Sequence, residues 1–286
     1  MNNYVTFRGT QGSNTPNTGR GMSPGLWGDC PLPEVILGNQ DGVHFFDDFL
    51  DFGLPGTQTT EINLGRYKVY NTGAGTIATN ASLGGTLTSG GIISMLADTA
   101  GDGSAIATQA SPFLLTGSTT NSGPMWLEAR MAITGIATNN AQWFFGLGDN
   151  SAYTLGAAKP LGDANAVASD VPFLGLQVNE DGLGVVRGVY ADEAATWTEV
   201  EDSVGTFAAN TFAKVGLKYD PSNSTSCVQF YFNGIPASSV ISAATLAGLT
   251  NMDAHPLGIV WAMFADSAGT STYGYCDWIR ACQLSP

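Results

Sequence analysis

The sequence has few charged residues, few histidines and no long apolar run. Only 12% of its 286 residues are Asp, Glu, Lys or Arg, and His44 and His255 are its two histidines. No stretch approaches the roughly 18 apolar residues of a membrane-spanning helix, so we expect no membrane span. The N-terminal stretch lacks the apolar core of a secretion signal, so we expect synthesis in a cytoplasm.

Basic residues are especially scarce. The chain has 10 Lys and Arg against 24 Asp and Glu, which gives a formal net charge of −14. A nucleic-acid-binding surface must be cationic, because it displaces counterions from phosphates. The charge therefore argues against nucleic acids and against anionic membranes as partners. Its ordinary consequence is solubility.

Cysteine is also rare. Cys30, Cys227, Cys276 and Cys282 form no CxxC motif and no cluster with histidine, which argues against a zinc site. Alternation along the last strand would place Cys276 and Cys282 on the same face. Six residues at about 3.3 Å each would separate them by roughly 20 Å, which is too far for a disulfide. We expect buried thiols and no bound metal or cofactor.

The clearest pattern present is a three-stranded meander over Phe212–Val240. Apolar and polar residues alternate in its first part, which is typical of a strand with one buried face. A turn signal follows, and then Cys227–Phe232, which is rich in aromatic and β-branched residues. This second strand ends at Asn233-Gly234, a pair that closes tight hairpin turns.

Another strand is expected over Met125–Ile136. Trp126, Glu128 and Arg130 share one face of it, and the opposite face is apolar and expected in the core. Gln142–Leu147 is the expected hairpin partner. Further strands are expected at Tyr67–Tyr70, Thr76–Thr79, Gly91–Leu96, Val171–Val178, Gly184–Tyr190, Leu257–Ala265 and Gly274–Leu284, with a short helix in 243–253.

Short apolar runs separated by Gly, Asn, Ser, Thr and Asp dominate the chain. This pattern is typical of an all-β protein built as an antiparallel β-sandwich or jelly roll. We expect residues 45–286 to form that sandwich as one domain. Residues 1–44 are expected to form an extended N-terminal arm.

The arm region is crowded with Gly, Asn, Thr, Ser and Pro and shows no sustained alternation. It is either a disordered leader or an arm that becomes ordered against a neighbouring subunit. We favour the arm, because a disordered tail has little reason to carry apolar anchors. The expected anchors are Leu26, Trp27, Val35, Ile36 and Leu37.

The order of these elements resembles the concanavalin A-like lectin/glucanase jelly roll, including its laminin-G-like relatives. A strand WLEARMAI is followed by QWFFGLGD, by the meander FAKVGLKYD…VQFYFNGIPASS, by LGIVWAMF and by a closing YCDWIRACQL. The resemblance covers roughly residues 43–286. It implies the fold and not an activity.

The resemblance to glucanases does not extend to catalytic residues. Glucanases of this kind carry a Glu-x-Asp-x-x-Glu strand, which supplies the two carboxylates of glycoside hydrolysis. That pattern is missing, and Glu128 offers one carboxylate with Arg130 as its expected ion-pair partner. We therefore expect no enzyme. Rings that could stack on a glycan are Trp126, Trp143 and Trp197.

A second resemblance concerns the junction LWGDCPLPEVILGNQDGVHFFDDFL, which looks like the start of virion structural proteins of tailed bacteriophages. It implies a capsid decoration (cement) protein in the virion, assembled in the host cytoplasm. Its partners would be the major capsid protein and sister copies in a homo-oligomer, with a trimer as one option. The alternative is a carbohydrate-binding, lectin-like module of a phage fibre or surface protein that binds a host-surface glycan. A glycoside hydrolase is the third and least supported hypothesis.

Overall fold

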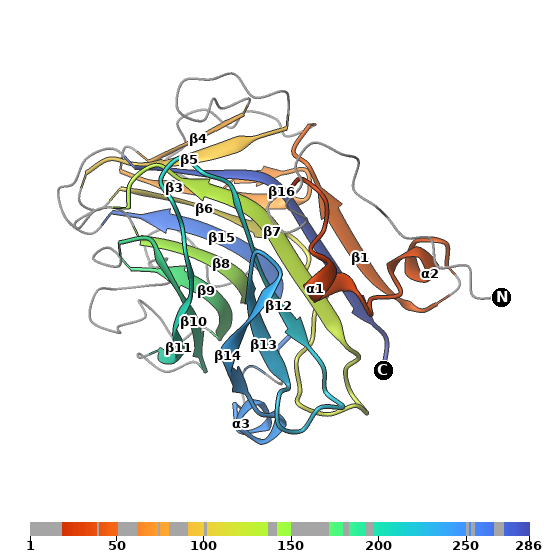
Figure 1. The fold of residues 1–286 in the computed structure, drawn as a ribbon. Coiled ribbons are helices and arrows are strands. Elements are labelled where there is room, and N and C mark those ends of the chain that lie inside the picture. Colours follow the sequence, from red (N-terminus) through yellow and green to blue (C-terminus); the bar gives the residue numbers. More distant parts are fainter. Residues whose placement is uncertain are drawn as a thin grey trace.

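The strands form two antiparallel sheets that pack face to face (Figure 1). The computed structural model describes residues 19–38, 40–50, 62–73, 75–79, 91–99, 102–136, 142–149, 172–179, 183–192, 197–249, 252, 255–265 and 272–286. The predicted fold class, an all-β antiparallel sandwich, is confirmed.

Sheet A contains the meander and the last strand of the chain. Its strands are β1 Gly42–Asp47, β4 Thr76–Thr79, β5 Ile93–Ala97, β7 Met125–Ile133, β12 Ala213–Tyr219, β13 Val228–Phe232, β14 Ile235–Ile241 and β16 Thr272–Leu284. Their order is β14-β13-β12-β7-β16-β5-β4, and β1 also pairs with β16.

Sheet B forms the second layer. Its strands are β2 Ile62–Leu64, β3 Tyr67–Thr72, β6 Gly103–Thr108, β8 Gln142–Gly148, β9 Phe173–Val178, β10 Val185–Ala191, β11 Thr198–Thr206 and β15 Gly258–Phe264. Their order is β11-β10-β9-β8-β15-β6-β3-β2.

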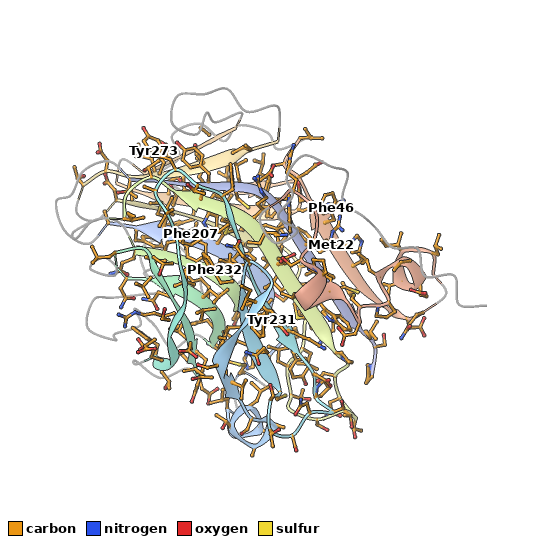
Figure 2. All side chains as sticks on the ribbon, in the orientation of Figure 1. Met22, Phe46, Phe207, Tyr231, Phe232 and Tyr273 are labelled. Atoms are coloured by element: carbon orange, nitrogen blue, oxygen red, sulfur yellow. The ribbon has the colours of Figure 1, made fainter. Side chains whose placement is uncertain are left out.

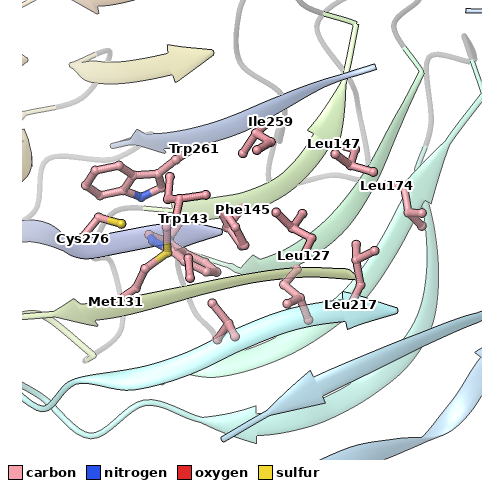
Figure 3. Packing of buried hydrophobic residues seen from close by; sticks show 14 of the residues in the cluster. Leu127, Met131, Trp143, Phe145, Leu147, Leu174, Leu217, Ile259, Trp261 and Cys276 are labelled. Carbon is pink, nitrogen blue, oxygen red and sulfur yellow. The ribbon is translucent and has the colours of Figure 1, made fainter. Parts of the chain in front are cut away.

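The core lies between the two sheets. On β7 it receives Leu127 and Met131, which alternate with the side chains of the opposite face, and both are 0% exposed. From sheet B it receives Trp143 and Trp261, and Figure 3 shows these rings packed beside the residues of β7. Burying each such side chain contributes about 1.5–3 kcal/mol, so the pattern of alternation fixes which face of each strand turns inward.

The three strands of the meander are confirmed, with ends that differ from the predicted ones by about one residue. β12 pairs with β13 and β13 with β14, all antiparallel. Asn233 and Gly234 have φ angles of 51° and 73°. A two-residue hairpin turn of this type needs positive φ at both positions, which explains why this dipeptide ends the second strand.

The pairing predicted for β8 is wrong. β8 lies in sheet B between β9 and β15, and β7 lies in sheet A between β12 and β16. Both edges of β7 are taken by strands that come more than 80 residues later, so the chain crosses to the other layer after β7. Local alternation identifies both strands but does not identify the sheet of either.

A β-bulge interrupts β16. Its register against β7 shifts between Cys276 and Trp278, so Asp277 is an extra residue. Cys276 therefore points into the core, while Cys282 lies on the opposite face of sheet A. The expectation that these two thiols share a face is wrong because the bulge breaks the alternation.

The N-terminal segment, residues 19–38, lies across sheet A and continues into β1. It contains two short helices, α1 Pro24–Trp27 and α2 Leu32–Ile36. A third helix, α3 Ala243–Ala247, follows the meander and is capped by the Ser242 side chain, which accepts a hydrogen bond from the N–H of Thr245. Among the described helices, none has the length and hydropathy needed to cross a membrane.

Candidate functional site

The outer face of sheet A is the side that points away from the core, and it carries rows of charged and aromatic side chains. The register places Glu128 between Gly216 and Arg280, and Arg130 between Lys214 and Trp278. At one end of the face Trp126 lies between Lys218 and Cys282, and towards the other end Ala132 lies beside Tyr275.

The N-terminal segment covers one half of this face. Leu26 and Trp27 are 0% and 6% exposed and pack with Trp126, Tyr231 and Cys282. Figure 1 shows α1 lying over β7 and β12. The segment thus closes an apolar cluster that is separate from the inter-sheet core.

Glu128 is the polar anchor beneath the segment. Its Oε2 accepts the backbone N–H of Ser23 at 3.0 Å and the indole N–H of Trp27 at 2.9 Å. The side chain is almost fully buried, at 1% exposure. Burial raises the pKa of this carboxyl, while the two hydrogen bonds and the nearby Lys214 ammonium oppose the rise.

Lys214 lies in the next row and is also buried. Its Nζ donates a hydrogen bond to the backbone oxygen of Gly21 at 2.9 Å. Burial lowers the pKa of this amine, and the charge of Glu128 opposes the fall. Two buried groups of opposite charge therefore hold the backbone of the same N-terminal segment.

Asp277, the extra residue of the bulge, binds two arginines. Its Oδ2 lies 2.6 Å from Arg130 Nη1, and its Oδ1 lies 2.5 Å from Arg20 Nη2. The Asp277 side chain is 0% exposed, and the Arg130 guanidinium also packs 4.1 Å over the ring of Phe212. The expected ion pair between Glu128 and Arg130 is wrong, because the bulge brings Asp277 next to Arg130.

The other half of the outer face carries two tyrosines. Tyr273 and Tyr275 follow each other on one side of β16, and their rings are stacked with centroids 6.1 Å apart and an interplanar angle of 25°. Tyr275 packs with Ile92 and Ala132. Tyr273 is 37% exposed, and Figure 2 shows it at the end of the molecule away from Met22 and Phe46.

The Tyr273 backbone is held firmly. Its N–H donates to Thr134 Oγ1 at 2.9 Å, and its carbonyl accepts the N–H of Thr134 at 2.9 Å. Tyr273 and Tyr275 were not among the residues that the sequence singled out. The signal that could have identified them is the spacing of two in YGY near the start of the last strand, which puts both rings on one face.

The expected arm anchors separate into two groups. Leu26, Trp27 and Val35 are buried within their own chain, while Ile36 and Leu37 are 54% and 73% exposed. In place of an extended arm, residues 19–38 form helices that pack on the sandwich. The apolar surface that orders them is the chain's own sheet A.

The three tryptophans expected to stack on a glycan are all buried. Trp143 is 0% exposed in the inter-sheet core, and Trp126 is 2% exposed beneath the N-terminal segment. Trp197 is 6% exposed and packs in the apolar layer on the outer side of sheet B. None of these three buried rings offers a free face to a sugar. The prediction failed because alternation along a strand does not show which surfaces another segment covers.

The outer side of sheet B shows no carboxylate pair in the described strands at its centre. On β8 the positions that alternate with the core residues are Gln142, Phe144 and Gly146, and on β9 they are Phe173, Gly175 and Gln177. No group of three or more His, Cys, Asp or Glu side chains suited to a metal occurs in the part of the chain that the structure describes.

No protein-family model matches the chain, and no curated protein matches it. Solved structures do match. An endo-1,3-β-glucanase from Streptomyces sioyaensis aligns with a TM-score of 0.53 and 15% identity, over 86% of this chain and 97% of that chain. An endo-acting O-glycanase of the human gut microbiota, described as initiating mucin breakdown, aligns with 0.52 and 10%, over 84% and 99%.

A third solved structure is an immunostimulatory antigen and pseudo-β-1,3-glucanase of Mycobacterium tuberculosis. It aligns with a TM-score of 0.50 and 11% identity, over 85% of this chain and 98% of that chain. At these identities the likeness establishes the concanavalin A-like fold of the chain and nothing finer.

The capsid-decoration hypothesis is wrong. The three solved structures reported above are an endo-1,3-β-glucanase, an O-glycanase and a pseudo-β-1,3-glucanase, which favour the carbohydrate-binding alternative over a virion protein. The hypothesis also needed an N-terminal arm that gains order from another subunit. Instead, residues 19–38 bury Leu26 and Trp27 against their own sandwich.

Proposed function

We propose that the chain is a non-catalytic carbohydrate-binding protein whose glycan lies against the exposed ring of Tyr273, at the end of the outer face of sheet A away from the N-terminal segment. The observation that carries the proposal is the exposed Tyr273 ring stacked on Tyr275. Among the Phe, Trp and Tyr side chains in the described ranges, Tyr273 alone is more than 36% exposed. A rigid aromatic ring with a polar tip suits a ligand that is apolar on one side and hydroxylated on the other.

The surroundings of Tyr273 fit such a ligand. The ring is preorganised, because Tyr275 supports it and Thr134 fixes its backbone on both sides. Binding a glycan there would order few additional side chains, which limits the entropic cost. The net charge of −14 favours a neutral glycan over an acidic one.

The proposal contains no catalytic step. Glycoside hydrolysis uses two carboxyl groups that are about 5–5.5 Å apart in retaining enzymes and further apart in inverting ones. The described central positions on the outer side of sheet B carry aromatic rings, amides and glycines instead. Glu128, the acid on β7, accepts hydrogen bonds from the N-terminal segment. The fold itself occurs both in an endo-1,3-β-glucanase and in a protein named a pseudo-β-1,3-glucanase.

The test is calorimetric titration of the whole chain with two neutral probes, a soluble β-1,3-glucan and desialylated mucin O-glycans. Tyr273→Ala should weaken binding roughly tenfold, equivalent to about 1.4 kcal/mol, and Tyr273→Phe should keep most of the affinity. Ile235→Ala is the matched control, because Ile235 is 61% exposed on the far edge of the same sheet.

Three results would overturn the proposal. One is a wild-type chain that binds neither probe. Another is binding that Tyr273→Ala leaves unchanged. The third is release of reducing sugar from either probe, since that would require the carboxylates that the described strands do not supply.

A further inference from the structure

Cys30 and Cys282 meet where the N-terminal segment rests on β16. Cys30 follows α1 and is half-buried, and Cys282 is fully buried on the outer face of sheet A. Both belong to the apolar cluster that Leu26 and Trp27 close. Cys30 packs against the part of the cluster that contains Cys282, and each of the two thiols shifts the pKa of the other.

Neighbouring contacts independently hold Cys30 over this position. Trp126 is the cross-strand partner of Cys282, and its indole N–H donates to Asp29 Oδ1 at 3.0 Å. Lys218, which follows in the same row, forms an ion pair with Asp29. The backbone N–H of Cys30 donates to the carbonyl of Trp27 at 3.1 Å. Asp29, which precedes Cys30, is thus bound to Trp126, which lies beside Cys282.

We propose that Cys30 and Cys282 are a redox-active pair that closes to a disulfide and locks the N-terminal segment onto sheet A. The oxidant we name is a small disulfide such as glutathione disulfide. Cys30 loses its proton and attacks one sulfur of the oxidant, and a first glutathione thiolate leaves. Cys282 then loses its proton and attacks the Cys30 sulfur, and a second glutathione thiolate leaves. The two protein thiols lose two protons and two electrons, and the oxidant takes up both.

The environments of the two thiols suit these roles. Cys30 is the accessible member, so it meets the oxidant first. Cys282 is buried in the same cluster, so it attacks second, as the resolving thiol, once Cys30 carries the mixed disulfide.

The lock would act on a large part of the chain. A bond between residues 30 and 282 closes a loop over most of the sequence, and long loops restrict the unfolded state most. It would also hold the segment that covers Glu128 and Lys214. The proposal is independent of the glycan site, because Tyr273 does not belong to the cluster that the N-terminal segment closes.

The experiment uses the full chain equilibrated in glutathione buffers that range from reducing to oxidising, then quenched in acid, alkylated and digested. Trypsin cleaves after Arg20, Arg66 and Arg280, so Cys30 lies on peptide 21–66 and Cys282 on the C-terminal peptide ACQLSP. We expect these two peptides to be linked under oxidising conditions and separate under reducing ones. The thermal midpoint should rise with the linked fraction.

Variants separate the lock from general thiol chemistry. Cys30→Ala should abolish the linked peptide and the redox dependence of the thermal midpoint. Cys227→Ala should change neither, because Cys227 is buried in the inter-sheet core. The proposal is overturned if no linked peptide forms at any ratio, if only glutathione adducts form, or if the link forms without raising the midpoint.

Discussion

The Glu128 carboxylate accepts the indole N–H of Trp27 at 2.9 Å, and this bond ties α1 to the middle strand of sheet A. Its other oxygen, Oε1, is buried and has no hydrogen-bond partner in the structure. A buried charge with one bonded oxygen is costly to leave without its donors. Trp27 and Ser23 are therefore structural parts of the sandwich, even though the sequence places them in an irregular leader.

Replacing Trp27 with Phe should destabilise the chain by about 1.5–3 kcal/mol more than the matched control, because a smaller aromatic ring remains but the hydrogen bond to a buried carboxylate is lost. Trp197→Phe is the matched control. Trp197 is also 6% exposed, and its indole N–H has no hydrogen-bond partner in the structure. Urea unfolding of both variants measures the difference, and equal losses would contradict the role assigned to Glu128.

The two arginines on Asp277 should contribute unequally. The Arg130 side chain is 16% exposed and Arg20 is 57% exposed, while Asp277 is 0% exposed. Arg130→Met should cost about 3 kcal/mol or more, because it leaves a buried carboxylate with a single, solvated partner. Arg20→Met should cost no more than about 1 kcal/mol. Chemical denaturation of the two variants provides the comparison, and a larger loss for Arg20→Met would be inconsistent with this account.

Local alternation was sufficient to predict the meander and the inward face of β7. Val215 and Leu217 alternate with lysine and glycine, and in the structure both lie in the core. The turn at Asn233-Gly234 could be predicted equally well, because its positive φ angles are a local property of the dipeptide. These features depend on neighbours within a few residues, so the local sequence is sufficient to predict them.

The candidate site could not be predicted in the same way. The partner of Arg130 depends on a bulge at Asp277, and that bulge exists only because β16 pairs with β7 across about 150 residues of sequence. The exposure of Tyr273 and the burial of Trp126 depend on which half of sheet A the N-terminal segment covers. That segment has only two short helices, so its sequence carries no period to detect.

His44 should make the stability fall in mild acid. It lies on β1 opposite Cys282, and its Nε2 is buried without a hydrogen-bond partner in the structure. Burial lowers its pKa below the ordinary 6.5, and Arg280 and Arg66 lower it further. The unfolded chain therefore binds a proton below about pH 6.5 that the folded chain does not, so the free energy of unfolding decreases as the pH falls below that value.

The prediction is measured as thermal midpoints of the wild type and His44→Gln between pH 8 and pH 5. The wild type should lose more stability than the variant as the pH falls below about 6.5. His255→Gln serves as the control, because the His255 side chain is 46% exposed. Parallel pH profiles for the wild type and His44→Gln would show that His44 does not cause the effect.

Gly188 should tolerate no side chain. It lies at an irregularity in the pairing of β10 with β11, and a Cβ there would lie 2.6 Å from Cδ2 of Phe230. Phe230 is 0% exposed in the core, so its ring has nowhere to move. Gly188→Ala should cost about 1–3 kcal/mol through overpacking.

Gly248→Ala is the control, because the nearest atom to its Cβ would be 3.3 Å away and its φ is −81°. That variant should stay within about 0.5 kcal/mol of the wild type. Urea unfolding measures both variants, and the midpoints are compared provided that the dependence of the free energy of unfolding on urea concentration stays the same. If Gly188→Ala is tolerated, the contact between β10 and Phe230 is looser than in the structure.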